Sequence, residues 1–355
     1  MDMPPLANNK KDYRFWIIKL GKALASKQYE SALFCADEAS NIAQTDTERA
    51  EVMNFQGDCL LILQRDEEAL SIYNKSLTQF QNTYQREEEP DLKEHIAKAF
   101  FQKMKTLAKL KRQAEIPAVY DEMICRFGAD NTPFIRKYLA KALLAKALCF
   151  THLAGREESL SNYVYALYDE LLQKFGNDTD KEVKQIVAKA LLGKGNALRG
   201  FEHHEDALKA YDDLIQKFSN ETNTTIKQTV AMAMNNKGFA LSNLKRDDDA
   251  LKAYDDLIQK FSNDTDKEVK QIVAKTTLGK GIVLSNLKRY NDALKAYDEL
   301  IEKFSNETDT TIKQQVAKAM QNKGVTLCQL DRYDDAIKMG IEFIRKFNNE
   351  TNAQG

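Results

Sequence analysis

The sequence predicts an all-α, right-handed superhelical α-solenoid of about eight stacked helix pairs, and three observations support this prediction. First, a glycine recurs every 43 residues, at Gly195, Gly238, Gly281 and Gly324. Second, each block spaces its apolar residues by three and four, the period of a helix with one buried face. Third, the 355-residue chain has only 5 Pro and 14 Gly, which favours helix. A fixed period is typical of stacked repeats, because one repeat cannot bury its own apolar face.

Two further positions keep the same spacing. An alanine follows each glycine after 12 residues, and a tyrosine follows the alanine after four in three of the four repeats. Gly340 stands at the tyrosine position of the last repeat. We expect the Gly and Ala to let two helices approach closely, and the Tyr to fill the space between successive repeats. These positions are Ala207, Ala250, Ala293, Ala336, Tyr211, Tyr254 and Tyr297.

Threonines near the start of each repeat predict helix N-termini. A Thr followed three residues later by Glu, at 179–182 and 265–268, has the pattern of a capping box. Thr225 and Thr311 are followed by Gln at the same distance, which predicts the same motif. We therefore expect a Thr side chain to cap each first helix.

The apolar residues outline two helices within one repeat. Residues 183–198 predict the first helix, a polar turn follows at 199–204, and a second helix is predicted at about 205–218. The segment that begins at Asn177 recurs 86 residues later at Asn263. The higher-order unit is therefore a pair of repeats.

The chain divides into four parts by how well the repeat is kept. Residues 1–10 are predicted to be a flexible tail, and 11–176 to hold about four degenerate repeats. Residues 177–348 hold four near-identical 43-residue repeats, and 349–355 are predicted to form a second tail.

The degenerate part still shows helix pairs. Two helices are predicted between 13 and 43, and further repeats at 47–83, 91–127 and 133–175. The segment 84–94 combines an acidic run with a Pro, which predicts a lengthened loop. The repeat at 133–175 has about five additional residues, which predict a longer second helix.

Charge, hydropathy and cysteine content exclude several functions. The formal net charge is −1, so there is no global attraction to nucleic acid or an anionic membrane. The N-terminus lacks the apolar core of a signal peptide, and no segment reaches membrane-spanning length. The 5 cysteines are widely spaced, so we expect reduced residues in the core. These features predict a cytoplasmic protein that makes no membrane contact.

No motif predicts catalysis, a metal or a cofactor. His203 and His204 fall in a predicted turn, where other repeats have Lys-Arg or Asp. The Gly-rich string at 193–198 lies inside a predicted helix, without the strand that precedes a phosphate-binding loop. No Ser, Cys or Lys has a recognisable base beside it. We therefore expect a non-enzymatic protein with no cofactor, no metal and no catalytic residue.

The Gly, the Ala twelve residues later, the Tyr four beyond and the apolar residue three past the Tyr resemble the tetratricopeptide repeat. The resemblance covers about 13–347 and is strongest from 177 onward. It implies a superhelix whose first helices line a concave groove that binds segments of other proteins. Two features depart from the family: the repeat has 43 residues in place of the usual 34, and a Lys precedes each Gly. The additional residues fit as about two turns at the start of the first helix.

Charge is segregated between the two helices of a repeat. Residues 180–199 carry five basic and two acidic residues, whereas 202–217 carry two basic and five acidic. If first helices line a groove, as the resemblance implies, that groove is basic and is expected to bind an acidic segment of another protein, as an adaptor or sensing subunit does. The candidate groove residues are Lys189, Asn196, Asn235, Asn236, Asn243, Lys275, Asn286, Lys318 and Asn322.

Other interpretations of these residues stay open. The lysines can pair with neighbouring acids and serve only solubility. A nucleic-acid-binding solenoid is the alternative function, and it is disfavoured because the aromatic residues hold packing positions and Lys outnumbers Arg. A chaperone tail is also disfavoured, because family members that bind one have a Lys four residues before the Asn, and here Leu192 precedes Asn196.

The last predicted helix, at about 334–347, has an apolar stripe that a further repeat would cover. The chain then stops at the opening of another repeat. We expect this end face to self-associate into a homo-oligomer, to meet a partner, or to continue into more protein. The stripe consists of Ile337, Ile341, Ile344 and Phe347.

Overall fold

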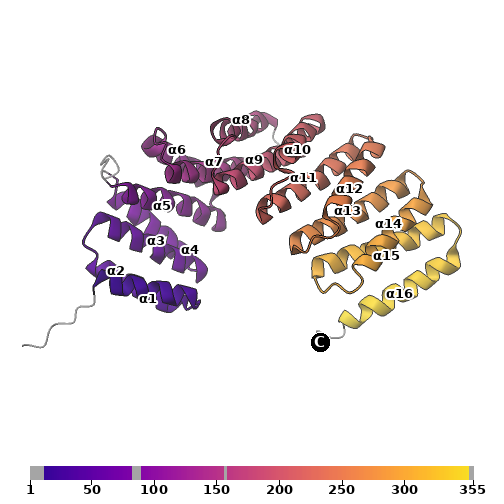
Figure 1. Ribbon diagram of the computed structural model, residues 1–355, viewed down its shortest axis with the longest axis horizontal. Coiled ribbons are helices and arrows are strands. Elements are labelled where there is room, and N and C mark those ends of the chain that lie inside the picture. The colour runs from indigo at the N-terminus through magenta and orange to yellow at the C-terminus, as the bar shows by residue number, and fades with distance from the viewer. Residues whose placement is uncertain (1–11, 82–88, 156–157, 352–355) are drawn as a thin grey trace, which may run out of the picture. The chain divides into compact units, whose positions relative to one another are not determined.

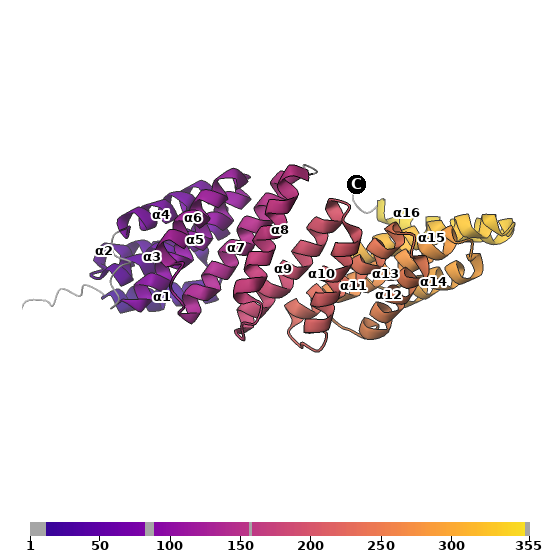
Figure 2. The ribbon, with the colours of Figure 1, turned by 90° about the horizontal axis from the view of Figure 1, so that it is seen from above.

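The computed structural model describes residues 12–81, 89–155 and 158–351, and every regular element within them is a helix (Figure 1). The chain divides into two compact units, residues 1–186 and 187–355. Within each unit the helices follow one another in chain order and are joined by short connections (Figures 1 and 2). The predicted all-α stack of helix pairs is confirmed.

The first unit contains the predicted degenerate repeats as helix pairs. The longer second helix expected at 133–175 is present, because α8 has 18 residues and α10 of the next repeat has 15. A short 3-10 turn, Gln113–Glu115, precedes α6. The helices are α1 (Tyr13–Ala25), α2 (Tyr29–Ile42), α3 (Asp46–Ile62), α4 (Asp66–Gln79), α5 (Pro90–Lys109), α6 (Ile116–Phe127), α7 (Pro133–Ala154) and α8 (Glu158–Phe175).

The second unit holds most of the near-identical repeats, and its boundary falls inside α9. The first helices of these repeats have 20 residues each, whereas the second helices α10, α12 and α14 have 14 or 15. The helices are α9 (Lys181–Gly200), α10 (His204–Phe218), α11 (Thr224–Asn243), α12 (Asp247–Phe261), α13 (Lys267–Asn286), α14 (Tyr290–Lys303), α15 (Thr310–Gln329) and α16 (Tyr333–Thr351).

Contact between successive repeats joins a first helix to the second helix before it, as in α12 with α13 and α14 with α15, and also joins neighbouring first helices. In the second unit α11 packs against α13, and α13 packs against α15. The second helices α12 and α14, whose residues are all described, do not pack backbone against backbone, and Asp248 of α12 lies 4.0 Å from Arg289 at the start of α14. In the first unit α5 likewise packs against both α3 and α7. Each first helix is therefore covered by its neighbours on several sides and keeps only one face for solvent.

The conserved spacing of Gly and Tyr has a direct structural cause. The ring of Tyr254 lies so close to Gly238 that a Cβ on the glycine would clash with the ring. The far end of the same ring faces Gly279 on α13 of the next repeat. Gly281 meets Tyr297 in the same way, so each Tyr packs within its own helix pair and can also reach the following one. Burial raises the pKa of Tyr254 to about 12.

The predicted threonine caps are wrong. The N-cap of α13 is Asp266, whose carboxylate accepts a hydrogen bond from the Val269 backbone N–H at 3.0 Å. The N-cap of α11 is Asn223, two residues before the expected Thr225. Short Asp and Asn side chains reach the N3 amide readily, so an Asp or Asn near each expected Thr takes the position. Asp180 and Asp309 accept the equivalent bonds.

Two predicted irregular segments are partly helical. The loop predicted at 84–94 is wrong from Pro90 onward, because α5 begins there and a Pro is tolerated in the first turn of a helix. Residues 84–88 lie outside the described residues, as does the predicted tail at 1–10. The predicted tail at 349–355 is wrong up to Thr351, where α16 ends, and its remainder is also outside them.

The cysteines are all free thiols. Cys35, Cys59 and Cys149 are buried, as expected for small apolar core residues. Cys125 and Cys328 are exposed, so the prediction of a core position is wrong for these two. Both lie on amphipathic helices, where the pattern does not separate the edge of the buried face from its centre.

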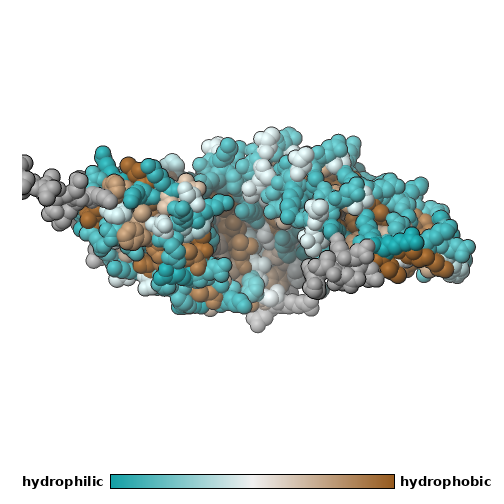
Figure 3. Space-filling view, turned by 90° about the horizontal axis from the view of Figure 1, so that it is seen from below, coloured by the Kyte–Doolittle hydropathy of each residue, from teal (hydrophilic) through white to brown (hydrophobic). Residues whose placement is uncertain are grey.

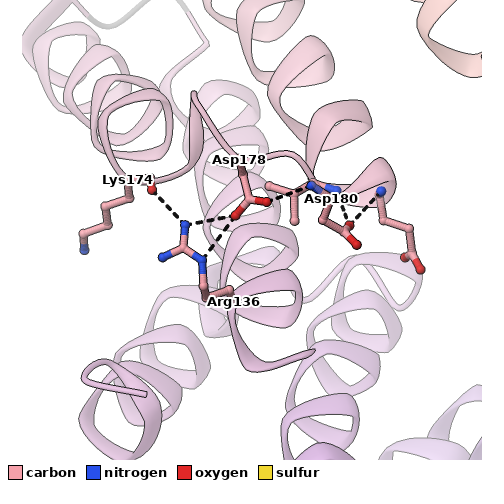
Figure 4. A network of polar contacts seen from close by, with 6 residues as sticks. Arg136, Lys174, Asp178 and Asp180 are labelled. Atoms are coloured by element: carbon pink, nitrogen blue, oxygen red, sulfur yellow. Dashed lines mark hydrogen bonds and ion pairs between the residues drawn. The ribbon is translucent and has the colours of Figure 1, made fainter. Parts of the chain in front are cut away.

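Ion pairs join each repeat to the loop that opens the next. Arg136 on α7 donates to the Asp178 carboxylate at 3.0 and 3.2 Å, and Asp178 accepts the backbone N–H of Asp180 (Figure 4). In the second unit Lys227 pairs with Asp264 at 2.8 Å. Asp264 then accepts the backbone N–H of Asp266. The loop that precedes each first helix is therefore tied to the first helix before it.

These loop carboxylates predict a loss of stability in acid. The Lys267 hydrogen bond, with the Ile312 backbone N–H, lowers the pKa of Asp309 to about 2. The Gln228 hydrogen bond lowers that of Asp266. Burial opposes the charged form of Asp264, but its bonds from Lys227 and from the Asp266 backbone N–H outweigh burial and lower its pKa.

Because the pKa of these carboxyl groups is lower in the folded protein than in the unfolded chain, the unfolded chain binds protons first as the pH falls. The stability that they contribute is therefore complete above about pH 4 and decreases as the pH falls toward 2. We expect the thermal midpoint, followed by circular dichroism, to fall over this window. Asp309→Asn keeps an N-capping side chain but loses the charge, so its midpoint should depend less on pH. Equal pH dependence of the variant and the parent would contradict this assignment.

Candidate binding surface on the first helices

Each first helix of the second unit leaves one stripe of side chains exposed. On α11 the exposed residues are Thr224, Met232, Phe239 and Asn243, which lie on one face at helical spacing. The opposite faces pack against second helices and neighbouring first helices. We call this exposed stripe the open face.

Side chains of one chemical type recur along the open face from helix to helix. One position, six residues before the conserved glycine, is cationic in three of four helices and forms the lysine column. A second position, seven residues later, is apolar in three of four helices and forms the apolar column. The lysine column is Lys189, Met232, Lys275 and Lys318, and the apolar column is Asn196, Phe239, Ile282 and Val325.

The lysine column differs from the other lysines of α11, α13 and α15 in having no partner among the described residues, and on α9 it shares this with exposed Lys181. Lys189, Lys275 and Lys318 are exposed, and within the described part of the chain none forms an ion pair. The lysine that precedes each conserved glycine is used differently, because it pairs with a second-helix Asp of the preceding repeat. These pairs are Lys237–Asp212 at 2.6 Å, Lys280–Asp255 at 2.6 Å and Lys323–Asp298 at 2.5 Å.

The remaining lysines of α11, α13 and α15 are also engaged. Lys227 pairs with Asp264, Lys267 with Asp309 at 3.0 Å and Lys270 with Glu307 at 2.9 Å. Lys313 has a partner too. Pairing with neighbouring acids therefore accounts for most of the basic character of the first helices, and it does not account for the lysine column.

Three of the candidate asparagines hold the repeats together. Asn196 accepts hydrogen bonds from the Tyr211 hydroxyl at 2.9 Å and from the Asn236 side-chain amide at 2.8 Å. Asn235 donates to Asn236 at 3.2 Å and accepts from the Thr276 hydroxyl at 3.0 Å. Asn235 is only 9% exposed, so it does not contribute to an open surface.

The other candidate asparagines remain available. Asn243 and Asn286 are exposed at the C-terminal ends of α11 and α13. Asn322 is half-buried, and only its backbone carbonyl accepts a hydrogen bond, from the Thr326 hydroxyl. Their amide groups can donate to and accept from the backbone of a bound segment.

The sequence interpretation missed the apolar column. Phe239 is 47% exposed, Ile282 is 39% exposed and Val325 is 61% exposed. Such exposure is unusual for apolar residues at one position of three neighbouring first helices. The Arg199 guanidinium lies over the Phe239 ring, 5.4 Å from its centroid. The signal in the sequence was present, because these residues are 43 apart and follow the lysine column by two helical turns.

The equivalent position in the first unit is satisfied internally. Lys98 on α5 stands six residues before Met104, which occupies the glycine position. Its ammonium pairs with Asp58 at 2.8 Å and lies over the Phe55 ring. Asp58 also accepts the hydroxyl of Tyr73. Within the described ranges, the lysine-column position is therefore paired on α5 and unpaired on α9, α13 and α15.

The end face is exposed as expected. Ile337 is 61% exposed and Ile344 56%, and hydrophobic residues gather over α16 at that end of the second unit (Figure 3). Ile341 is exposed as well, whereas Phe347 is half-buried and its ring contacts that of Phe343. Self-association through this face stays a prediction.

The described ranges hold neither a metal-binding cluster nor a membrane-spanning helix. Among these residues no group of His, Cys, Asp and Glu is arranged to hold a metal ion. None of the helices in the same ranges combines the length and the apolar character needed to cross a membrane.

The comparisons with known proteins agree with the repeat assignment. A family model described as tetratricopeptide repeat matches residues 188–265. A search of curated proteins gave no match.

Three solved structures are similar in fold, at identities that show the fold alone. The apo form of RapI has a TM-score of 0.60 at 13% identity, over 95% of this chain and 98% of that one. BtubC (BKLC) from P. vanneervenii has a TM-score of 0.51 at 16% identity, and the match covers 68% of this chain and 92% of that one. A tetratricopeptide repeat protein from Parabacteroides merdae ATCC 43184 has a TM-score of 0.50 at 12% identity, and the match covers 87% of this chain and 98% of that one. Residues 188–265 therefore match the tetratricopeptide repeat, and the chain shares the helical-repeat fold of these three structures.

Proposed function

We propose that the protein is a non-enzymatic interaction scaffold, an adaptor or sensing subunit, whose open face in residues 187–355 binds an acidic segment of a partner protein. The observation that carries this proposal is the lysine column. Lys189, Lys275 and Lys318 are exposed and unpaired, whereas every other lysine of α11, α13 and α15 has a partner. A row of cations held apart from the acids of its own chain attracts an acidic ligand and orients it.

The open face favours a protein segment over a nucleic acid. Nucleic-acid grooves combine dense positive charge with aromatic faces on which bases stack. Here Phe239 is the aromatic residue of the apolar column, and its ring is already covered in part by Arg199. The pairing of Lys237, Lys280 and Lys323 with Asp residues removes further charge that phosphates would need.

Charge reversal of the lysine column tests the proposal. Peptides are first selected on the parent protein from a random library of about a dozen residues, and their affinities are measured by fluorescence anisotropy. We expect acidic peptides to be selected. Lys189→Glu, Lys275→Glu and Lys318→Glu combined should weaken their binding by about tenfold or more, because three attractive contacts become repulsive.

A matched control changes the same charge on the same unit. Lys209, Lys252 and Lys295 are exposed on the second helices α10, α12 and α14. Their combined replacement by Glu should leave peptide affinity within about twofold of the parent. The proposal fails if no peptide is selected, if both triple variants lose affinity equally, or if a single-stranded oligonucleotide binds the open face more tightly than the peptides.

A further inference from the structure

We propose that the bound segment adopts a polyproline II conformation and places one triplet of residues over each first helix. In each triplet one side chain contacts the apolar column, one faces the lysine column, and one points to solvent. This inference rests on the proposed function and names the class of segment that the open face takes.

The spacing of the helices sets the period of the ligand. α11, α13 and α15 pack directly against one another, and packed helices have axes about 8–10 Å apart. A polyproline II segment advances about 3.1 Å per residue and has three residues per turn, so like-facing side chains recur about every 9 Å. One triplet therefore advances the segment by one repeat, and every repeat meets the same side of it.

The two other regular conformations match this spacing less well. In an extended strand, side chains on one face recur about every 6.6 Å, which is shorter than the spacing of two packed helices. Every second such side chain recurs at about 13 Å, which is longer than that spacing. An α-helical ligand offers a like-facing residue about every 10.5 Å, and its backbone groups are already bonded internally. A polyproline II backbone has no internal hydrogen bonds and needs outside partners.

The open face supplies such partners between and beside the two columns. The position four residues after the lysine column holds Asn322 on α15, whose half-buried amide is available, whereas the amide of Asn236 on α11 is engaged with Asn196 and Asn235. Exposed Asn243 and Asn286 lie one turn beyond the apolar column and face the same way.

The irregularities of the columns define an expected charge pattern. Met232 replaces the lysine on α11 and is 41% exposed, so the triplet over α11 is expected to take no acid. On α9, Asn196 replaces the apolar residue, so that triplet is expected to need an acid and no apolar anchor. The triplets over α13 and α15 each take one acid and one apolar residue.

Two synthetic peptides with the same residues in different order test the three-residue period while the charge stays the same. The probes are a fluorescein-labelled peptide of four Leu-Glu-Pro triplets, and a second in which the same Leu and Glu residues alternate before the Pro residues. We expect the triplet peptide to bind the parent protein about fivefold or more tightly than the alternating one, measured by anisotropy. Met232→Lys should strengthen the triplet peptide about twofold or more and leave the alternating peptide unchanged.

The outcomes distinguish this inference from the proposed function. If both peptides bind equally and both lose affinity on charge reversal of the lysine column, the open face binds acidic segments but the three-residue period is wrong. If a helical peptide with Leu and Glu in a heptad pattern binds more tightly than the triplet peptide, the polyproline II conformation is wrong. Absence of binding by the triplet peptide also overturns the inference, and the library selection then decides the proposed function separately.

Discussion

Gly238→Ala is expected to lower the free energy of unfolding by about 1–3 kcal/mol, as overpacking of a filled core does. The Tyr254 ring occupies the space that the new methyl group would take, and it is 3% exposed. The ring is held from the other side by α13 of the next repeat, where Gly279 faces it. Neither α11 nor the ring can move without disturbing a neighbouring repeat, so relaxation is limited.

The same substitution at the equivalent position of the last repeat is expected to have the opposite sign. Gly324 has open space where a Cβ would lie, because Gly340 takes the place of the tyrosine. Gly324 is in the interior of α15, where Ala is favoured over Gly by about 0.5–1 kcal/mol. Urea unfolding of the two variants measures the contrast. A loss of stability in both, or in neither, would show that the tyrosine does not set the glycine position.

Asp121→Ala is expected to destabilise the protein by about 2–3 kcal/mol, because it leaves a buried ammonium without its carboxylate. The Lys146 side chain on α7 is 8% exposed, and its Nζ lies 2.7 Å from Asp121 Oδ1. The Tyr120 ring lies beneath the ammonium, 4.6 Å away. Burial alone would lower the pKa of Lys146, but the hydrogen bond and charge of Asp121, together with the Tyr163 hydroxyl, outweigh burial and raise that pKa.

The matching variant removes the cation and keeps the volume. Lys146→Met should change stability by less than about 1 kcal/mol, because an apolar side chain in this position needs no partner and Asp121 remains largely solvated. The double variant should resemble Lys146→Met alone. Urea unfolding at pH 7 gives all three values. If Lys146→Met is as destabilising as Asp121→Ala, the pair itself is a net source of stability and the argument from desolvation is wrong.

The fold could be predicted from the sequence because its signals are local and repeated. The helix pairs follow from apolar spacing, and the positions of Gly238 and Tyr254 follow from the need for a close helix crossing filled by one ring. The caps could not be predicted with the same success. Thr265 and Asp266 are neighbours that both have capping side chains, and the choice between them depends on where the loop is held by Lys227 and Asp264.

The open face could be predicted only in part. The basic character of the first helices was visible in the sequence, and two of the lysines it singled out, Lys275 and Lys318, are exposed. The same reasoning included Asn235, which the structure buries between two repeats. It left out Phe239 and the rest of the apolar column, because an apolar residue at helical spacing is taken for core unless the rotation of the helix is known.

The sequence by itself determined that this protein is a stack of helix pairs, because a period of 43 residues with one apolar face per helix has no other way to bury that face. Only the tertiary structure decided which cations are free. Lys237 is neutralised by Asp212, 25 residues away on an adjacent helix, and Lys275 is not neutralised at all. That distinction depends on how each helix is rotated against its neighbours, which is set by the packing of whole repeats and not by the order of residues within one of them.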